Sequence, residues 1–563
     1  MTVGIIGTGP AVVAVQAALV DTETERIDVD ELGEADLAVV TGTAGAPVFA
    51  AANEHALETE TPWIAVELGG VGGIAVADAS VACFGPESAC YECLSGRVTA
   101  NLDRQPDSRA PARHTVRFAG AVAGQEAARW LAGEDGTAGR VITLPYEQRR
   151  LLALPNCVCD PRRQRALGRS VEKRDVEDSL ARAEQGLDDL IGIVQEVGEV
   201  ESFPVPYYLA QSCDTAGFSD ASAAREAAGV DPDWNAAFMK ALGEGLERYC
   251  AGIYRTADLE RGAPETVEDA VAPSAFVCEG VPDPSTPIEW VRGEELASRE
   301  NRLLPAEFVY HPPPEHRYHS PVTTGLGLGN SAVEALLSGL YEVIERDAMM
   351  LSWHSSFEPL GLAVDGGDYE TMVKRADSEG YSVRTLLLTQ DVDVPVVAAA
   401  VTGEEWPKLA FGTAADLDVT DAAESALAEA LQNWTELRGM GPDEAADAMG
   451  AIGQYASDPG PAREFAEPET SVPAGSVGPD SVPDGEAELD AVLGRLGDAG
   501  LEAYATRLTT RDVEELGFET VRALVPAAQP LTFGAAYFGE RANTVPGELG
   551  FETRPDREHH PFP

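Results

Sequence analysis

The apolar positions of residues 1–165 alternate between short runs and helical spacing. Three runs have the length of buried strands: residues 3–6, 37–41 and 63–67. A tight Gly7-Thr8-Gly9 turn follows the first run, and residues 11–20 then have the spacing of a helix. Alternating strands and helices predict a parallel sheet with helices packed on it. We therefore expect an α/β, Rossmann-like domain over residues 1–165.

Longer helical patterns dominate the rest of the chain. A basic, proline-containing stretch at 161–165 marks the end of the first domain, and residues 170–563 read as a larger α+β domain. Apolar spacing predicts long helices at residues 176–194, 235–253, 332–353 and 422–437. Residues 456–485 are rich in Pro, Gly, Ser and acidic side chains, a composition that predicts a disordered surface insertion.

Charge narrows the possible partners. The 563 residues include 95 Asp and Glu against 40 Lys and Arg, which gives a net charge of −55. This balance argues against nucleic acid and against anionic membranes as partners. The acidic residues are spread along the whole chain, and all but four of the basic residues are arginine. We interpret this as adaptation to the salty cytoplasm of a halophilic archaeon, where salt screens self-repulsion, rather than as ordinary acidity.

Three other features of the sequence argue for a cytoplasmic protein. The sequence contains no apolar run long enough to cross a membrane. Its first twenty residues lack the basic start of a secretion signal. Cysteines are sparse, which argues against a disulfide framework.

Four cysteines form two close pairs, Cys90-x-x-Cys93 and Cys157-x-Cys159. Four thiolates suit tetrahedral Zn²⁺, and a site closed by four protein ligands is structural rather than catalytic. Redox chemistry and unliganded thiols remain alternatives.

The first turn supports a weaker hypothesis. The segment Gly4-Ile5-Ile6-Gly7-Thr8-Gly9-Pro10-Ala11 resembles a dinucleotide-binding fingerprint, and Asp28 and Asp30 follow at the distance of a ribose-binding acid. A nicotinamide oxidoreductase would use such a turn. A tight strand–helix connection without any ligand explains the same residues.

Two acid-rich helices carry the strongest chemical signal. Glu244, Glu247 and Arg248 repeat the pattern of Glu342, Glu345 and Arg346. Helical geometry brings Glu334, Glu342 and Glu345 to roughly one side of their helix. A solvated face is the common explanation in so acidic a chain. However, the second helix follows a glycine-rich segment, residues 323–330, whose N–H groups suit phosphate, and carboxylates suit Mg²⁺. Together they predict a nucleotide site.

These motifs resemble the YcaO family. The resemblance covers about residues 170–563 and rests on Gly325-x-Gly327-x-Gly329-Asn330-x-x-x-Glu334-Ala335 and on the two Glu-x-x-Glu-Arg segments. Ser179 fits an amino-terminal nucleotide-contacting segment, and Lys173 falls one residue out of register with the family's lysine. Glu429 and Gln432 lie in a segment similar to a late family helix.

The resemblance implies the following site. Glu244, Glu247, Glu342 and Glu345 are implied as Mg²⁺ ligands. The residues implied around ATP are Ser179, Lys173, Glu244, Asn330, Glu334 and Arg346. Arg346 and Pro563 are implied as catalytic, since the ending His559-His560-Pro561-Phe562-Pro563 resembles the proline-rich end that enters the active site of azoline-forming cyclodehydratases. A frayed tail is the alternative. The first domain resembles a ThiF-type, ubiquitin-activating-like domain that binds zinc and helps to present the substrate.

The resulting hypothesis is ATP-dependent cyclodehydration of Cys, Ser or Thr in a ribosomally made peptide, the chemistry of azole-containing bacteriocins. Thioamide formation with an external sulfur donor and a non-catalytic peptide-presenting scaffold are the alternatives. The chain begins at the first predicted strand, so we expect a separate leader-binding protein as partner. We also expect a dehydrogenase that acts on the product, and a homodimer.

Overall fold

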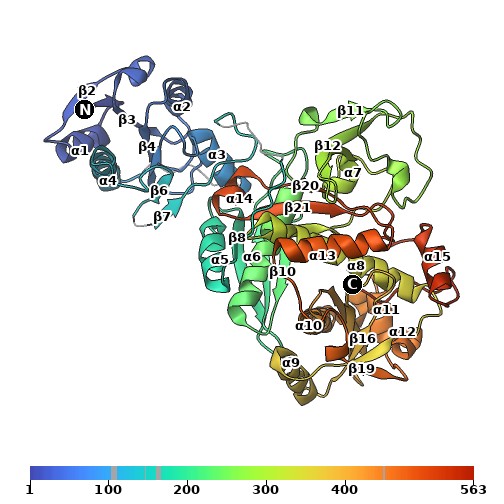
Figure 1. The fold of residues 1–563 in the computed structure, drawn as a ribbon. Coiled ribbons are helices and arrows are strands. Elements are labelled where there is room, and N and C mark those ends of the chain that lie inside the picture. Colours follow the sequence, from blue (N-terminus) through green and yellow to red (C-terminus); the bar gives the residue numbers. More distant parts are fainter. Residues whose placement is uncertain (103–110, 146, 160–165, 448–449) are drawn as a thin grey trace.

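The structure is a computed structural model that describes all residues except 103–110, 146, 160–165 and 448–449. The basic stretch expected at the domain boundary, residues 161–165, lies outside the described residues. In Figure 1 an amino-terminal unit in blue and cyan stands beside a larger region that runs from green to red.

The amino-terminal unit is built on a sheet whose described strands follow the order β2-β1-β3-β4-β5-β6-β7. Their bounds are β1 Thr2–Ile6, β2 Glu23–Arg26, β3 Leu37–Thr43, β4 Trp63–Leu68, β5 Ala79–Phe84, β6 Arg140–Thr143 and β7 Glu147–Arg150. The first four strands in this order are parallel, as the sequence predicts. The prediction is wrong for the rest, because β5, β6 and β7 pair antiparallel. The unit's helices are α1 Pro10–Ala18, α2 Pro47–Thr59, α3 Tyr91–Ala100 and α4 Arg113–Leu131.

The larger region contains several sheets. A small one has the order β10-β9-β8, formed by β8 Val194–Glu201, β9 Tyr207–Ser212 and β10 Glu226–Val230. A second has the order β11-β12-β20-β21-β14, with β13 beside β12. Its strands are β11 Glu260–Gly262, β12 Ile288–Glu295, β13 Asn301–Pro305, β14 Leu326–Gly329, β20 Tyr504–Arg507 and β21 Glu519–Leu524. A third, β18-β17-β16-β15-β19, is formed by β15 Leu360–Ala363, β16 Ser382–Leu387, β17 Val396–Thr402, β18 Leu409–Ala415 and β19 Ser471–Pro473.

Three long helices cover these sheets. Helix α6, Trp234–Ala251, packs on β9 and β10; α8, Ala332–Trp353, packs on β14 and β21; and α10, Val419–Ala445, packs on β17 and β18. They confirm three of the predicted long helices, and α8 has the predicted bounds. The remaining helices of the region are α5 Val176–Ala183, α7 Ala306–Val309, α9 Gly367–Ser378, α11 Ile452–Ser457, α12 Gly460–Phe465, α13 Glu486–Asp498, α14 Arg511–Glu515 and α15 Arg541–Glu548. No described helix is long and apolar enough to cross a membrane.

The helix predicted at residues 176–194 is wrong after its first half. Helix α5 ends at Ala183 and a short 3-10 turn, Glu184–Gly186, follows it. The Asp188 carboxylate then accepts the N–H groups of Leu190 and Ile191, which fixes a turn instead of a helix. Leu187 and Leu190, which contribute to the helical spacing of the sequence, pack against the core from this segment.

The disordered insertion predicted at 456–485 is also wrong. Helix α12 and strand β19 lie within it, and β19 adds to the third sheet as a parallel neighbour of β15. Ala456, Ala462 and Phe465 are buried, and the ring of Phe465 lies 5.4 Å from that of Trp353. A few apolar anchors therefore order a segment whose average composition is that of a loop.

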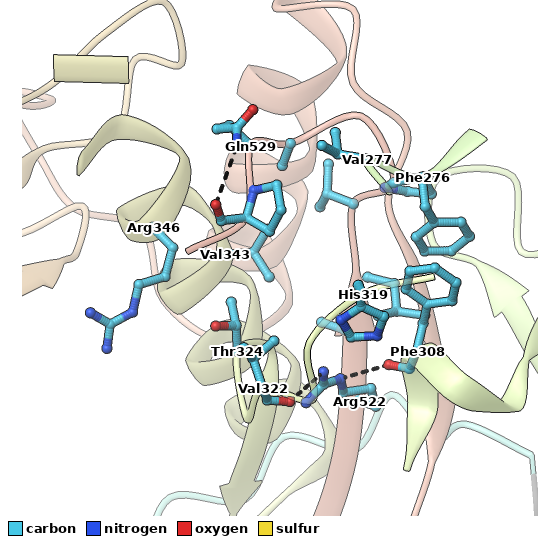
Figure 2. Close-up of a pocket in the computed structure, with 16 residues that line it drawn as sticks. Phe276, Val277, Phe308, His319, Val322, Thr324, Val343, Arg346, Arg522 and Gln529 are labelled. Carbon is cyan, nitrogen blue, oxygen red and sulfur yellow. Dashed lines mark hydrogen bonds between the residues drawn. The ribbon is translucent and has the colours of Figure 1, made fainter. Parts of the chain in front are cut away.

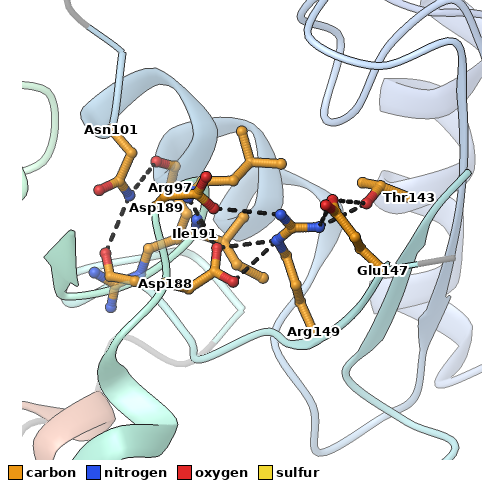
Figure 3. Close-up of polar contacts among 10 residues, drawn as sticks. Arg97, Asn101, Thr143, Glu147, Arg149, Asp188, Asp189 and Ile191 are labelled. Carbon is orange, nitrogen blue, oxygen red and sulfur yellow. Dashed lines mark hydrogen bonds and ion pairs between the residues drawn. The ribbon is translucent and has the colours of Figure 1, made fainter. Parts of the chain in front are cut away.

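Polar contacts join the amino-terminal unit to the larger region (Figure 3). Arg149 of β7 pairs with Asp188 at 2.9 Å and with Asp189 at 3.3 Å. Arg97 of α3 is fully buried and pairs with the fully buried Asp512 of α14. Because an unpaired buried charge is costly, these contacts tie the two parts together most strongly at Arg97.

Candidate active site

The acid-rich helices meet at one cleft. Glu244 and Glu247 come from α6, Glu342 and Glu345 from α8, and Glu429 from α10; we call these five residues the acidic cluster. A cleft of about 770 Å³ is lined by Glu244, Glu342 and Glu429, and an adjoining cavity of about 430 Å³ by Glu244 and Glu247. The structure therefore brings the carboxylates of both predicted helices together, which rules out a solvated face for them.

The acidic cluster is electrostatically crowded. Burial, together with the nearby Glu342 and Glu244, raises the pKa of Glu247 to about 8. Burial likewise raises the pKa of Glu429 to about 7, and it raises the pKa values of Glu244 and Glu345. A cation bound among crowded carboxylates stabilises their charged forms against mutual repulsion, and Mg²⁺ prefers oxygen ligands. The donor set thus fits a divalent cation.

Two arginines offset part of this charge. Arg248 pairs with Glu244 at 2.5 Å, and Arg346 lies 3.4 Å from Glu345 and 3.9 Å from Glu342. Among the described residues, the buried Nε–H of Arg346 has no hydrogen-bond partner. This group and the cations around it make the cleft suitable for an anionic ligand such as phosphate.

Thr413 and Arg522 belong to the site although sequence reasoning missed them. Thr413 of β18 donates its hydroxyl to Glu345 at 2.5 Å and its N–H to Glu429 at 2.5 Å. Arg522 of β21 lies buried near Glu342 and Glu247, and burial lowers its pKa to about 10. Arg522 reaches the site through the pairing of β21 with the distant strand β14, and Thr413 through its contact with Glu345, 68 residues away, so no local motif could have indicated them.

Five of the six residues predicted around ATP line the two adjoining spaces, four of them the 430 Å³ cavity and Arg346 the 770 Å³ cleft. Ser179 donates to Asn330 Oδ1 at 2.9 Å, and Asn330 Nδ2 donates to Glu334 at 3.2 Å. All three line the 430 Å³ cavity. Lys173 does not join them, because its exposed side chain pairs with Asp484 at 2.5 Å.

Two cations that were not predicted line this cavity instead, Arg174 and Lys240. Lys240 precedes Glu244 by one helical turn on α6, and its Nζ lies 2.7 Å from Asp231. That spacing was a signal available in the sequence, since residues four apart share a helix face.

The glycine-rich segment has a different role from the one predicted. Leu326–Gly329 is strand β14, which pairs with β21. A Cβ atom on Gly327 would lie 2.1 Å from the carbonyl oxygen of Ala335, so glycine allows α8 to pack directly on the strand. Flanking N–H groups are already used, because Gly325 donates to Glu342 at 3.1 Å and Asn330 to Glu334 at 3.0 Å. The prediction of a phosphate-cradling loop at 323–330 is therefore wrong.

The last residues pack into the molecule and reach the cleft. Phe562 is buried among Trp353, Phe411 and Phe465. Trp353 and Tyr455 donate to the main-chain oxygens of Glu558 and His559, both at 2.7 Å. Arg346 Nη1 donates to the main-chain oxygen of Pro563 at 3.2 Å. The frayed-tail alternative is thus wrong, and both residues predicted as catalytic are in contact.

The four paired cysteines, which we call the cysteine cluster, converge in the amino-terminal unit. Their sulfur atoms all lie within 4.8 Å of one another, with Cys90–Cys157 and Cys93–Cys159 both at 3.6 Å. Four sulfurs around one zinc at about 2.3 Å would be separated by about 3.8 Å. Hydrogen bonds from Cys157 and the other two thiols, together with the charge of Arg511, lower the pKa of Cys159. The arrangement fits a closed metal site.

The amino-terminal turn is occupied by internal contacts. Arg26 donates to the carbonyl oxygen of Gly7 at 2.8 Å. Asp28 caps the 3-10 helix Val29–Glu34, and the Asp30 carboxylate lies 3.4 Å from His55. Each acid expected to bind a ribose therefore has an internal contact away from the turn, which favours the interpretation without a ligand.

Comparison with known proteins agrees with this geometry. Residues 228–529, more than half of the chain, match the model of a family described as YcaO cyclodehydratase, ATP- and Mg²⁺-binding. The chain belongs to the YcaO family. The matched segment begins at Ala228, whose N–H donates to Glu244, and it contains α6, α8 and α10. As a YcaO protein, the chain is an ATP-dependent peptide cyclodehydratase.

One relative by sequence and two solved structures resemble the chain over different lengths. An uncharacterized protein of Methanothermobacter thermautotrophicus is 29% identical over 313 residues, which cover 54% of this chain and 81% of that protein. A heterocyclase solved in complex with substrate and cofactor aligns with a TM-score of 0.75 at 20% identity, over 98% of this chain and 83% of its own. The heterocyclase TruD aligns with a TM-score of 0.66 at 21% identity, over 98% and 81%. At these identities the two structures establish a shared fold that includes the amino-terminal unit.

Proposed function

We propose that this YcaO enzyme cyclises Cys, Ser or Thr residues of a ribosomally made peptide to thiazolines or oxazolines. The observation that supports this best is the position of Arg346. It contacts two carboxylates of the acidic cluster on one side and the main-chain oxygen of Pro563 on the other. A cation between a site for Mg²⁺ and phosphate and a buried proline-rich tail suits the transfer of a phosphoryl group to a peptide.

In the proposed reaction, the substrate thiol or hydroxyl attacks the carbonyl carbon of the preceding residue. The amide oxygen takes the γ-phosphoryl group of ATP, and ADP leaves. Loss of phosphate carries that oxygen away and leaves a carbon–nitrogen double bond, after the thiol or hydroxyl and the amide nitrogen have each lost a proton. Arg346 offsets charge on the transferring group, and Pro563 positions the peptide at the end of the cleft.

The residues around the cavities would hold the nucleotide. Ser179, Asn330, Glu334 and Glu244 are assigned to ATP, and Arg346 to its phosphates. Glu244, Glu247, Glu342 and Glu345 are assigned to Mg²⁺, which when bound would neutralise phosphate charge. The structure supports Arg174 and Lys240 rather than Lys173 as the cations nearest the nucleotide.

The amino-terminal unit is proposed to be a ThiF-like, zinc-binding unit that presents the peptide. The geometry of the cysteine cluster and the buried Arg97–Asp512 pair support this role. We further propose a cytoplasmic protein adapted to high salt. Its proposed partners are a leader-binding protein, a dehydrogenase acting on the azoline and a second copy of the chain.

The test compares wild-type enzyme with Glu342→Gln on a candidate precursor peptide encoded beside the gene. We expect the wild type to remove the mass of one water per modified residue while releasing phosphate, and the variant to lose at least about 100-fold in both. Exchange of an oxygen for sulfur would instead identify thioamide formation. Unchanged turnover in Glu342→Gln would contradict the site, and a wild type that binds no ATP would favour a non-catalytic scaffold.

A further inference from the structure

A second, smaller cavity lies next to the acidic cleft. Its volume is about 80 Å³, and it lies between α8, the end of β21 and the segments around Phe276 and Phe308. Figure 2 shows the side chains of Phe276, Phe308 and His319 stacked along one wall, with Val343 and Arg346 of α8 opposite. None of these aromatic residues belongs to the site assigned above.

The cavity presents a mostly apolar surface, because Arg522 and Gln529 on its wall use their polar groups in internal hydrogen bonds. The Arg522 guanidinium donates to the carbonyl oxygens of Phe308, Val322 and Thr323. Gln529 accepts from the N–H of Gly539 and donates to the carbonyl oxygen of Tyr537, both at 2.9 Å. Burial lowers the pKa of His319 to about 4, so its ring is neutral at physiological pH. A ligand of this cavity is therefore selected by apolar contact and not by charge.

Arg346 connects this cavity with the reaction cleft, since it lines both. In Figure 2 the Arg346 guanidinium points away from the aromatic wall. Only the stem of the side chain is left to face the small cavity. Thr323 lines the cleft and Thr324 the small cavity, so the two spaces also meet across one peptide bond.

We propose that this cavity binds the apolar side chain of the peptide residue that precedes the cyclised Cys, Ser or Thr. The inference rests on the proposed function and deepens it by naming a specificity pocket. The amide oxygen that accepts the phosphoryl group belongs to that preceding residue, so the Cβ atom of its side chain lies two bonds from the reacting carbon. With the oxygen held near Arg346, this side chain is the part of the peptide that can enter a space bordered by the Arg346 stem.

Size and polarity narrow the residue further. A water molecule occupies about 10–15 Å³ by this measure, so 80 Å³ accommodates a branched aliphatic side chain such as leucine. A charged side chain would lose its hydration without gaining a partner there. We therefore expect Leu, Ile, Val or Met before the modified residue, and Asp or Lys to be rejected.

The experiment uses the peptides Gly-Gly-Xaa-Cys-Gly-Gly with Leu, Gly or Asp at Xaa, supplied at millimolar concentration with ATP and Mg²⁺. Loss of one water and phosphate release are measured. We expect kcat/KM for the leucine peptide to exceed that for the glycine or aspartate peptide about 10- to 100-fold. In Val277→Phe, which fills the cavity, this preference should disappear, so that the leucine and glycine peptides react with equal kcat/KM within the variant.

The matched control is Val281→Phe, because Val281 is 99% exposed and lies four residues beyond Val277. It should keep the wild-type preference. Equal preference in Val277→Phe and in the wild type would overturn the proposal. A thermal-unfolding midpoint below that of the control would reveal a misfolded variant, and Ala528→Leu, which fills the same cavity from another segment, then decides in its place.

A binding measurement keeps the pocket testable if no short peptide reacts. Saturation-transfer NMR with N-acetyl-leucinamide should show contact of the leucine methyl groups with wild-type enzyme and with Val281→Phe, and its loss in Val277→Phe. Equal saturation in all three proteins overturns the pocket. Loss of saturation only in Val277→Phe would support the pocket, whether or not the full-length precursor is modified. An unmodified precursor would count against the proposed function alone.

Discussion

The acidic cluster and the cysteine cluster both bring together groups that repel one another when they are ionised. The acidic cluster is open to a cleft, whereas the cysteine cluster is closed. The four cysteine sulfurs lie within 4.8 Å of one another, and Leu154 N–H and Arg511 donate to them from outside. The carboxylates instead come from three helices and line a cleft of about 770 Å³. A closed set of four ligands leaves no position for a substrate, whereas an open set of oxygens does.

The contrast also concerns coupling to the fold. Cys93 and Arg97 lie one turn apart on α3, and Arg97 pairs with Asp512 in the buried contact between the two parts of the molecule. Tyr249 of α6 donates to the same Asp512 at 2.7 Å. The cysteine cluster is thus placed to hold the structure together, and the acidic cluster to act. Variants of the cysteine cluster should therefore change the stability of the protein, and variants of the acidic cluster should change its turnover.

The largest effect should come from Glu247→Gln. Removing one carboxylate of the acidic cluster should reduce ATP turnover at least about 100-fold. The metal-free variant should unfold at the same temperature as the wild type or higher, because glutamine replaces a buried acid whose pKa is raised to about 8 by burial and by two neighbouring carboxylates. Phosphate release and thermal unfolding measure the two quantities, and a destabilised variant with normal turnover would reverse the assignment.

Deleting residues 561–563 should have the next largest effect. The deletion removes Phe562 from its aromatic pocket and Pro563 from Arg346. We expect azoline formation to fall about 10- to 100-fold, because the peptide loses its positioning at the cleft. ATP binding, measured by calorimetry, should change less than twofold, since Ser179, Asn330 and Glu334 lie in the other cavity. Retained azoline formation would instead indicate a role for the tail outside catalysis.

Cys93→Ser should act on stability. We expect the variant to bind less than one zinc per ten chains and to lose about 2–5 kcal/mol of unfolding free energy, by analogy with the loss of a structural crosslink. The matched control is Cys83→Ser, because Cys83 is buried on β5 outside the cysteine cluster. The control should retain its zinc, measured by metal analysis, and equal zinc content in both variants would refute the site.

The packed tail gives a smaller, pH-dependent effect. Burial and the neighbouring His559 lower the pKa of His560 to about 3; His354 and Arg346 also face it, and it bonds to the oxygen of Thr532 at 2.9 Å. The folded histidine stays neutral while the unfolded one takes up a proton below pH about 6.5. The contribution of neutral His560 to the free energy of unfolding is therefore complete above pH about 6.5. It is lost as the pH falls toward 3, and the loss reaches about 2 kcal/mol at pH 5.

The check compares wild type with His560→Gln in chemical unfolding between pH 7 and pH 5. Glutamine keeps a donor for Thr532 but does not titrate, so its stability should fall less steeply with acid. Parallel pH profiles for the two proteins would show that His560 is not the group responsible. High salt should be held constant, since screening affects the 95 acidic side chains at the same time.

Elements with local signals were predictable. Helix α8 had the predicted bounds because Ser331 caps its start and apolar spacing runs unbroken to Trp353. The spacing of Glu342 and Glu345 on that helix was likewise local information. The cysteine pairs were recognisable because ligand spacing is fixed by metal geometry.

The predictions that failed concerned features that depend on contacts between residues far apart in the sequence. The glycines of β14 serve close packing against Ala335, and their composition alone resembles a phosphate loop. Arg522 enters the site because β21 pairs with the distant strand β14, and Thr413 because it contacts Glu345, 68 residues away. Phe465 orders a segment of loop-like composition only because Trp353 is there to receive it. Register and tertiary partners of this kind are not encoded in local spacing.

The smallest expected effect is a difference between Lys240, which lines the open site, and Lys173, which lies outside it. Lys240 lines the 430 Å³ cavity beside Glu244, whereas Lys173 is exposed and pairs with Asp484. Lys240→Ala should raise the KM for ATP about tenfold, the effect of losing about 1.4 kcal/mol of binding. Lys173→Ala should change it less than twofold, since exposed ion pairs contribute little. Steady-state kinetics at saturating peptide measures both. A tenfold effect at Lys173 with none at Lys240 would mean that residues 170–175 move onto the nucleotide when it binds, and the open site would then be one that closes.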